Sequence, residues 1–140
     1  VPIARWEQIT LLLAGLVGIS LLMLAVWLTP DPSGLGTHQQ LGLPPCTFLD
    51  WIGIPCPSCG GTTAFAHFVR GHWASAVRAN AASTLLAALC VVGAPWSWAS
   101  AWHRRYFGVC DIVRTLTIVM LVFIAVALTQ WVGRLRGWWM

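Results

Sequence analysis

The stretch ITLLLAGLVGISLLMLAVWL, residues 9–28, decides the fold class of this 140-residue chain. It contains no charged side chain, and it is as long as the roughly 20 apolar residues that a helix needs to cross a bilayer. Trp6 and Trp27 lie near its two ends, where the amphipathic indole ring suits the headgroup layer. The stretch therefore predicts a transmembrane helix.

Two further apolar runs of similar length follow, at about residues 79–98 and 112–132. Pro95 falls in the last turn of the second run, where we expect it to kink or end the helix. Together the three runs predict an all-α integral membrane protein with three transmembrane helices. We expect residues 1–140 to form a single membrane domain.

The composition supports lipid as the solvent and argues against nucleic acid as a partner. Hydrophobic residues make up 58% of the chain and charged residues only 9%, whereas a soluble domain carries roughly 25% charged residues. The net charge of +4 comes from arginines that lie singly or in pairs beside the apolar runs. Arginines in such positions anchor helix ends at headgroups. We therefore expect the partners to be the lipid bilayer and other membrane protein subunits.

The loop at residues 29–78 separates the first two apolar runs. It opens with the helix-breaking sequence Thr-Pro-Asp-Pro-Ser-Gly and contains four further prolines. From residue 62 to 69 apolar side chains return at helical spacing, Arg70-Gly71 is typical of a helix end, and we expect residues 73–77 to lead directly into the second run. Residues 62–77 are therefore predicted to be short interfacial helix. Within the first run, Ala14 and Gly18 form a small-xxx-small pair that indicates helix contact.

The distribution of arginine gives the orientation little support. Three spans place the N-terminus and the second loop on one side, with Arg5, Arg104, Arg105 and Arg114. The other side then carries Arg70, Arg78, Arg134 and Arg136. The numbers are equal, but the tight His103-Arg104-Arg105 group favours a cytoplasmic N-terminus. This orientation places the loop at residues 29–78 on the outer face of the membrane.

That loop contains a cysteine motif, Cys56-Pro57-Ser58-Cys59-Gly60. Proline after the first cysteine favours a tight turn, and glycine after the second permits a positive φ, so that backbone N–H groups can point at sulfur. Both thiolates can then face one point, as in half of a tetrahedral zinc site. Cys46 could supply a third sulfur by folding back. The candidate ligands are therefore Cys46, Cys56 and Cys59, for zinc, iron or copper(I).

A fourth ligand must come from the same side of the membrane. The candidates there are His38, His67, His72 and Asp50. We prefer His67, because it follows the motif directly and imidazole is a common partner of three thiolates. Cys90 lies within the second run and Cys110 in the opposite loop, so the topology excludes both.

Two other interpretations of the cysteines stay open. Cys46 could form a disulfide with Cys56 or Cys59 and staple the loop, although this leaves one thiol unpaired. Alternatively, Cys56 and Cys59 could be the catalytic dithiol of a membrane thiol–disulfide oxidoreductase, with Cys46 as the resolving thiol. The chain has no other catalytic constellation. This favours a non-enzymatic accessory or structural subunit whose loop is made rigid by the cysteines, with a metal-handling protein as a third possibility.

The segment from Cys46 to Asn80 also resembles an uncharacterised family of small bacterial membrane proteins, a domain of unknown function. Its signature reads roughly Cys-Pro-x-Cys-Gly-x-Thr-Arg-Ala, after an earlier cysteine and before Gly-x-x-x-x-Ala-x-Arg-x-Asn. Thr63 stands where the family usually has arginine. The resemblance implies a multi-span protein of the bacterial inner membrane and marks the loop as its site, but it implies no activity.

Overall fold

The computed structural model describes residues 2–137, and in this range the protein is helical with no strand. Three helices are long and apolar enough to cross a membrane: α1 (Arg5–Trp27), α4 (Trp73–His103) and α5 (Ile112–Leu135). Three short helices lie between α1 and α4: η1 (Thr37–Leu41), α2 (Thr47–Ile52) and α3 (Gly61–Phe68). The predicted all-α fold with three candidate spans is confirmed.

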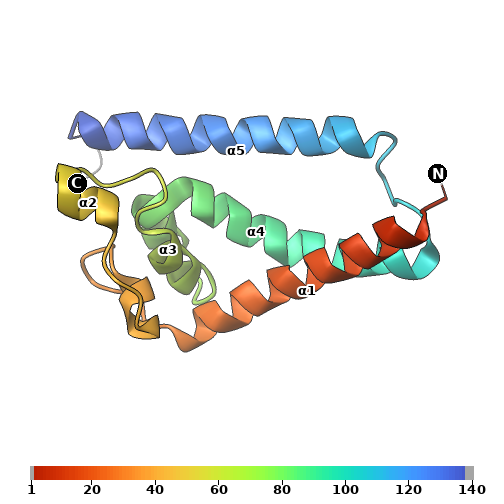
Figure 1. Ribbon diagram of the computed structural model, residues 1–140, viewed down its shortest axis with the longest axis horizontal. Coiled ribbons are helices and arrows are strands. Elements are labelled where there is room, and N and C mark those ends of the chain that lie inside the picture. Colours follow the sequence, from red (N-terminus) through yellow and green to blue (C-terminus); the bar gives the residue numbers. More distant parts are fainter. Residues whose placement is uncertain (1, 138–140) are drawn as a thin grey trace.

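Helix α4 lies between α1 and α5 and contacts both (Figure 1). The short helices lie at one end of the molecule together with the C-terminal end of α5. At the other end, the Ile3 N–H donates to the Arg104 carbonyl at 3.1 Å, which ties the N-terminus to the α4–α5 connection. The N-terminus and the α4–α5 connection therefore lie at one end of the long helices, and the loop at residues 29–78 lies at the other end, as predicted.

The contact between α1 and α4 depends on small residues of α1. Gly15 and Gly18 are both buried. A Cβ on Gly15 would lie 2.3 Å from the indole nitrogen of Trp98, and that nitrogen donates to the Leu12 carbonyl at 3.2 Å. Ala14 is exposed, so the predicted Ala14–Gly18 pair is wrong in its first member. The face of α1 that packs against α4 contains Gly15 in place of Ala14, together with Gly18.

Helix α4 is two helical segments joined at Asn80, whose φ of −166° and ψ of 108° are extended. The helix resumes at once, because the Asn80 side-chain oxygen accepts the Ser83 N–H at 2.9 Å, as an N-cap residue does. Helix α4 begins before the predicted run at about residues 79–98 and extends past its end. Pro95 neither ends nor interrupts the helix, which continues to His103.

The predicted stop at Arg70-Gly71 and the predicted continuation of residues 73–77 into the second long helix are confirmed, so the segment at residues 62–77 consists of two parts. Its first part is α3, and its second part is the opening segment of α4. Thr63, Ala64 and Ala66 form the buried face of α3, which packs against α4 and α1. Arg70 then fastens this region to the end of α1, with one guanidinium nitrogen 3.2 Å from the Ala25 carbonyl.

Helix α5 stands apart from the other long helices over most of its length (Figure 1). In its most apolar 18-residue window no residue is buried. Its side-chain hydrogen bonds to the rest of the described chain come from its C-terminal turns, through Gln130, Trp131 and Arg134. Its attachment is therefore local and lies beside the cysteine loop.

Candidate thiolate site

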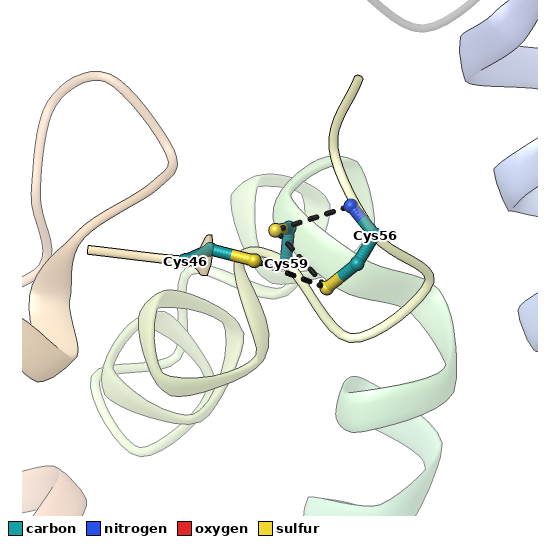
Figure 2. A group of neighbouring side chains, drawn as sticks. All are labelled: Cys46, Cys56 and Cys59. Carbon is teal, nitrogen blue, oxygen red and sulfur yellow. Dashed lines mark hydrogen bonds between the residues drawn. The ribbon is translucent and has the colours of Figure 1, made fainter. Parts of the chain in front are cut away.

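The structure brings Cys46, Cys56 and Cys59 together, and we call these three residues the cysteine triad. Their sulfur atoms all lie within 4.8 Å of one another. The sulfur of Cys56 is central, 3.7 Å from that of Cys46 and 3.2 Å from that of Cys59 (Figure 2). All three are free thiols. Their proximity agrees with the prediction from the sequence spacing.

Cys56 and Cys59 meet because the intervening residues form a turn. The Cys59 N–H donates to the Cys56 carbonyl at 3.1 Å, and the Cys56 N–H donates to the Cys59 sulfur at 3.3 Å (Figure 2). Gly60 follows with a φ of +82°. A Cβ there would lie 2.5 Å from the Ala79 carbonyl oxygen, so both the backbone conformation and the close approach of α4 require glycine.

Cys46 reaches the other two cysteines from the start of α2. It occupies the N-cap position of that helix. The backbone N–H of Leu49, in the first turn, lowers the pKa of the Cys46 thiol below its usual value, and a hydrogen bond with Cys59 adds to this effect. Cys46 is also partly exposed. It is therefore an accessible thiol that ionises readily.

Cys59 has the opposite environment. It is buried, and this burial raises the pKa of its thiol to about 12, with the neighbouring Cys56 and Cys46 thiols acting in the same direction. At neutral pH it is a protonated thiol unless a cation replaces the proton. The triad therefore combines a readily ionised outer thiol with an inner thiol that resists ionisation.

The turn at residues 56–60, which we call the cysteine turn, is fastened to α4 by Asn80. The Asn80 amide donates to the Pro57 carbonyl at 2.9 Å and to the Cys59 carbonyl at 3.2 Å. Asn80 is 1% exposed, so these are interior hydrogen bonds that water does not replace. The residue that breaks α4 is thus the one that fixes the turn.

Helix α5 fastens the same turn from the other side. Arg134 donates to the Cys59 carbonyl at 3.0 Å and also to the Ala79 carbonyl at the break in α4. The Trp131 indole donates to the Pro55 carbonyl at 2.9 Å. Gln130 bridges the break, since its amide donates to the Val77 carbonyl at 3.0 Å. Both ends of the cysteine turn are therefore held by side chains remote in sequence.

Sequence reasoning missed these four residues, Asn80, Gln130, Trp131 and Arg134. Gln130 carries a signal that could have revealed its role, because a polar side chain within a predicted span usually has a specific partner. In the structure it is 5% exposed, and its side-chain oxygen accepts the Ala81 N–H.

The cysteine triad lines one wall of a pocket of about 560 Å³. Residues of η1 and of the loop before it, including His38 and Gln39, also line this pocket. The His38 ring nitrogen Nε2 lies 3.1 Å from the Pro44 carbonyl oxygen. Of the histidines proposed from the sequence, His38 is the one that shares this pocket with the cysteines.

His67, the preferred fourth ligand, is not among the side chains gathered around the triad. It lies on α3 with its ring 5.9 Å from that of His72, and it lines a different pocket. Cys90 packs against α1 near Gly18, and Cys110 lies in the connection at the opposite end. The exclusion of these two cysteines agrees with the structure.

Thr63 occupies a site that does not suit arginine. It is 0% exposed, and its hydroxyl lies 2.7 Å from that of Thr37, which is also 0% exposed. The Thr37 hydroxyl in turn accepts the Asp31 N–H at 3.0 Å. The threonine at position 63 therefore joins α3 to η1 through a pair of buried hydroxyls, and Thr37 in turn contacts the loop after α1.

Comparison with known proteins finds one family whose match covers this site. Residues 46–94 match a family described as "Protein of unknown function (DUF2752)". The match begins at the first cysteine of the triad and ends within α4, so it includes the cysteine turn and Asn80. No curated protein and no solved structure matches the chain.

Proposed function

We propose that the cysteine triad binds a soft divalent metal ion, with zinc the best fit, and that the ion makes the loop of a small membrane protein rigid. The observation that carries this proposal is the convergence of three sulfur atoms within 4.8 Å. A disulfide accounts for only two of them. A tetrahedral metal ion requires several thiolates at one point.

The sulfur spacing supports this choice. Zinc–sulfur bonds of about 2.3 Å in a tetrahedron separate neighbouring sulfurs by about 3.8 Å, and those of Cys46 and Cys56 lie 3.7 Å apart. A metal ion would also replace the proton that burial otherwise keeps on Cys59. The fourth ligand would come from the pocket, where His38 or a small molecule can occupy the open position.

The proposed setting is a bilayer, with the protein as an accessory subunit of a larger membrane complex. Three apolar helices with large exposed side chains support a lipid environment. We place the loop on the outer face of a bacterial inner membrane. Purification in mild detergent should yield the chain with stoichiometric membrane partners, and a chain that purifies alone and stays well folded would count against the subunit role.

Elemental analysis of the unreduced, purified protein tests the metal site, together with thiol counting before and after chelation. We expect about one zinc per chain in the wild type and in Cys90→Ser, which removes a cysteine outside the triad. Cys46→Ser should lose most of the metal. A metal-free protein with two of its five thiols lost to a disulfide would contradict the proposal and support a structural staple instead.

The contrast between Cys46 and Cys59 favours thiol–disulfide exchange as a second candidate function. In this reaction the Cys46 thiolate attacks a substrate disulfide and displaces one of its sulfurs as a thiol. Cys56 then attacks the Cys46 sulfur, which releases the second substrate thiol and leaves a Cys46–Cys56 disulfide. The substrate is reduced, the pair is oxidised, and an external dithiol must restore it. If Cys56→Ser keeps full exchange activity with a small disulfide, this candidate is wrong.

A further inference from the structure

A second cleft lies beside the cysteine turn, between the loop after α1 and the first turns of α4. Two adjoining hollows of about 350 and 330 Å³ form it, and they share a wall of Ser33, Gly34, Arg78 and Ala79. Arg134 lines one of these hollows and His67 the other. The cysteines of the triad line neither, so this cleft is distinct from the thiolate site.

The cleft has positive charge with no paired anion. Arg78 is exposed, and within residues 2–137 its side chain makes no hydrogen bond or ion pair. Arg134 is partly buried, and its hydrogen bonds go to neutral carbonyl groups, those of Cys59 and Ala79. A guanidinium placed out of bulk water without a carboxylate favours an anion beside it.

The other polar groups of the cleft suit an oxygen-rich anion. Ser75 lines the wall, as does Ser33, whose hydroxyl donates to the Asp31 carboxylate and the Leu35 carbonyl. The Nδ1 atom of His67 is buried and has no hydrogen-bond partner within the described chain, which is costly unless a ligand or water supplies one. The Asp31 carboxylate also lines the cleft, but it accepts hydrogen bonds from Ser33, which lower its pKa and keep it charged. With two arginines and one aspartate, the charged side chains of the cleft have a net charge of +1.

The position of the cleft favours a phosphate group as the anion. Arg78 lies just before the break in α4, and Arg134 lies in the last turn of α5. Both arginines therefore lie at the loop-side ends of helices that would cross the bilayer, where phosphate groups of lipids are concentrated. A singly charged phosphodiester matches the surplus of one positive charge.

We propose that this cleft binds a phosphate group, carried by a phospholipid headgroup or supplied as free phosphate, with Arg78 as the principal contact. The inference rests on the proposed membrane setting but not on the metal site. Native mass spectrometry of the full chain in detergent tests it, with dioleoyl phosphatidylglycerol, phosphate-free dioleoylglycerol and inorganic phosphate as the three probes. Zinc content is measured on the same samples, so that a failure of the metal proposal can be distinguished from a failure of the phosphate proposal.

We expect one phosphatidylglycerol retained per chain and no retained dioleoylglycerol. Arg78→Gln should reduce retention at least about fivefold, because a charge-assisted hydrogen bond is lost. Arg114→Gln, which removes an exposed arginine at the opposite end of α5, should leave retention unchanged. The zinc content of Arg78→Gln should equal that of the wild type.

Competition separates the two sources of phosphate. Displacement of the lipid by millimolar inorganic phosphate would show that the cleft recognises the phosphate group alone. Retention despite added phosphate would identify the lipid as the ligand. Equal retention by Arg78→Gln and Arg114→Gln, or retention of dioleoylglycerol to the same extent as phosphatidylglycerol, would overturn the proposal.

Discussion

Asn80 has two separable tasks at the residue scale, one in the cysteine turn and one in α4. Its amide donates to the carbonyls of Pro57 and Cys59, while its oxygen caps the second segment of α4 at Ser83. Serine is as good an N-cap as asparagine but is too short to reach the turn. Substitution by serine and by alanine therefore distinguishes the two roles.

We expect Asn80→Ala to lower the free energy of unfolding in detergent by about 2 kcal/mol, since it removes buried hydrogen bonds and leaves the Pro57 carbonyl unpaired. Asn80→Ser should lose roughly half as much. Thermal unfolding followed by circular dichroism measures both. If the serine variant matches the wild type, the bonds to the cysteine turn contribute nothing to stability.

Cys46 should be the first of the triad to react with an alkylating reagent. The Leu49 N–H lowers the pKa of the Cys46 thiol, and a lowered thiol pKa means that the thiolate is present at a lower pH than usual. In chelator-treated, reduced protein, the alkylation rate of Cys46 should therefore rise at a lower pH than that of N-acetylcysteine in the same buffer.

Peptide mapping by mass spectrometry after timed iodoacetamide treatment measures these rates. Cys59, whose pKa burial raises to about 12, should remain unmodified longest. The prediction is contradicted if Cys46 and N-acetylcysteine react with the same pH midpoint.

The cysteine triad was predictable because its signal is local. Cys56 and Cys59 are three residues apart, and the proline and glycine between and after them specify the turn. The choice of His67 was less successful, because spacing along the chain says nothing about the direction in which α3 presents its side chains. His38 reaches the pocket through a loop fold that no local pattern encodes.

At the element scale, the contact between α1 and α4 offers a matched pair of glycines. Gly15 packs against the Trp98 indole, whereas a Cβ on Gly93 would meet no atom within 4 Å. Gly93→Ala should be neutral or stabilise by up to about 1 kcal/mol through helix propensity. Gly15→Ala should instead lower the free energy of unfolding. The added methyl group would displace the Trp98 indole and break its hydrogen bond to the Leu12 carbonyl.

Thermal unfolding of the two variants in the same detergent provides the comparison. An equal melting temperature for Gly15→Ala and Gly93→Ala would contradict the close approach of the helices at Gly15. A lower value for Gly15→Ala alone is the expected result.

Helix existence was easier to predict than helix ends. Each long apolar run became a helix, since hydropathy over about 20 residues is a strong signal. The break at Asn80 was missed, because the groups that make it tolerable are on α5. Pro95 was expected to kink or end α4. The helix does not end there, because proline removes only one backbone donor, and it continues for two turns beyond Pro95.

At the scale of the whole molecule, α5 is held mainly where it meets the break in α4. Gln130 supplies partners for groups that the break leaves unpaired, a donor for the Val77 carbonyl and an acceptor for the Ala81 N–H. The residues of α5 toward Ile112 lie away from α4 (Figure 1). Loss of this one side chain should therefore loosen the whole helix from the bundle.

We expect Gln130→Leu to speed hydrogen exchange at Ala81 and across the cysteine turn, measured by mass spectrometry in detergent, because the Ala81 N–H loses its buried acceptor. Thr129→Val is the matched control. Its hydroxyl bonds only to the Ala125 carbonyl within α5, so exchange should stay at the wild-type rate. If both variants exchange alike, the attachment of α5 does not depend on Gln130, and the hydrogen bonds of Arg134 and Trp131 alone hold the third helix to the site.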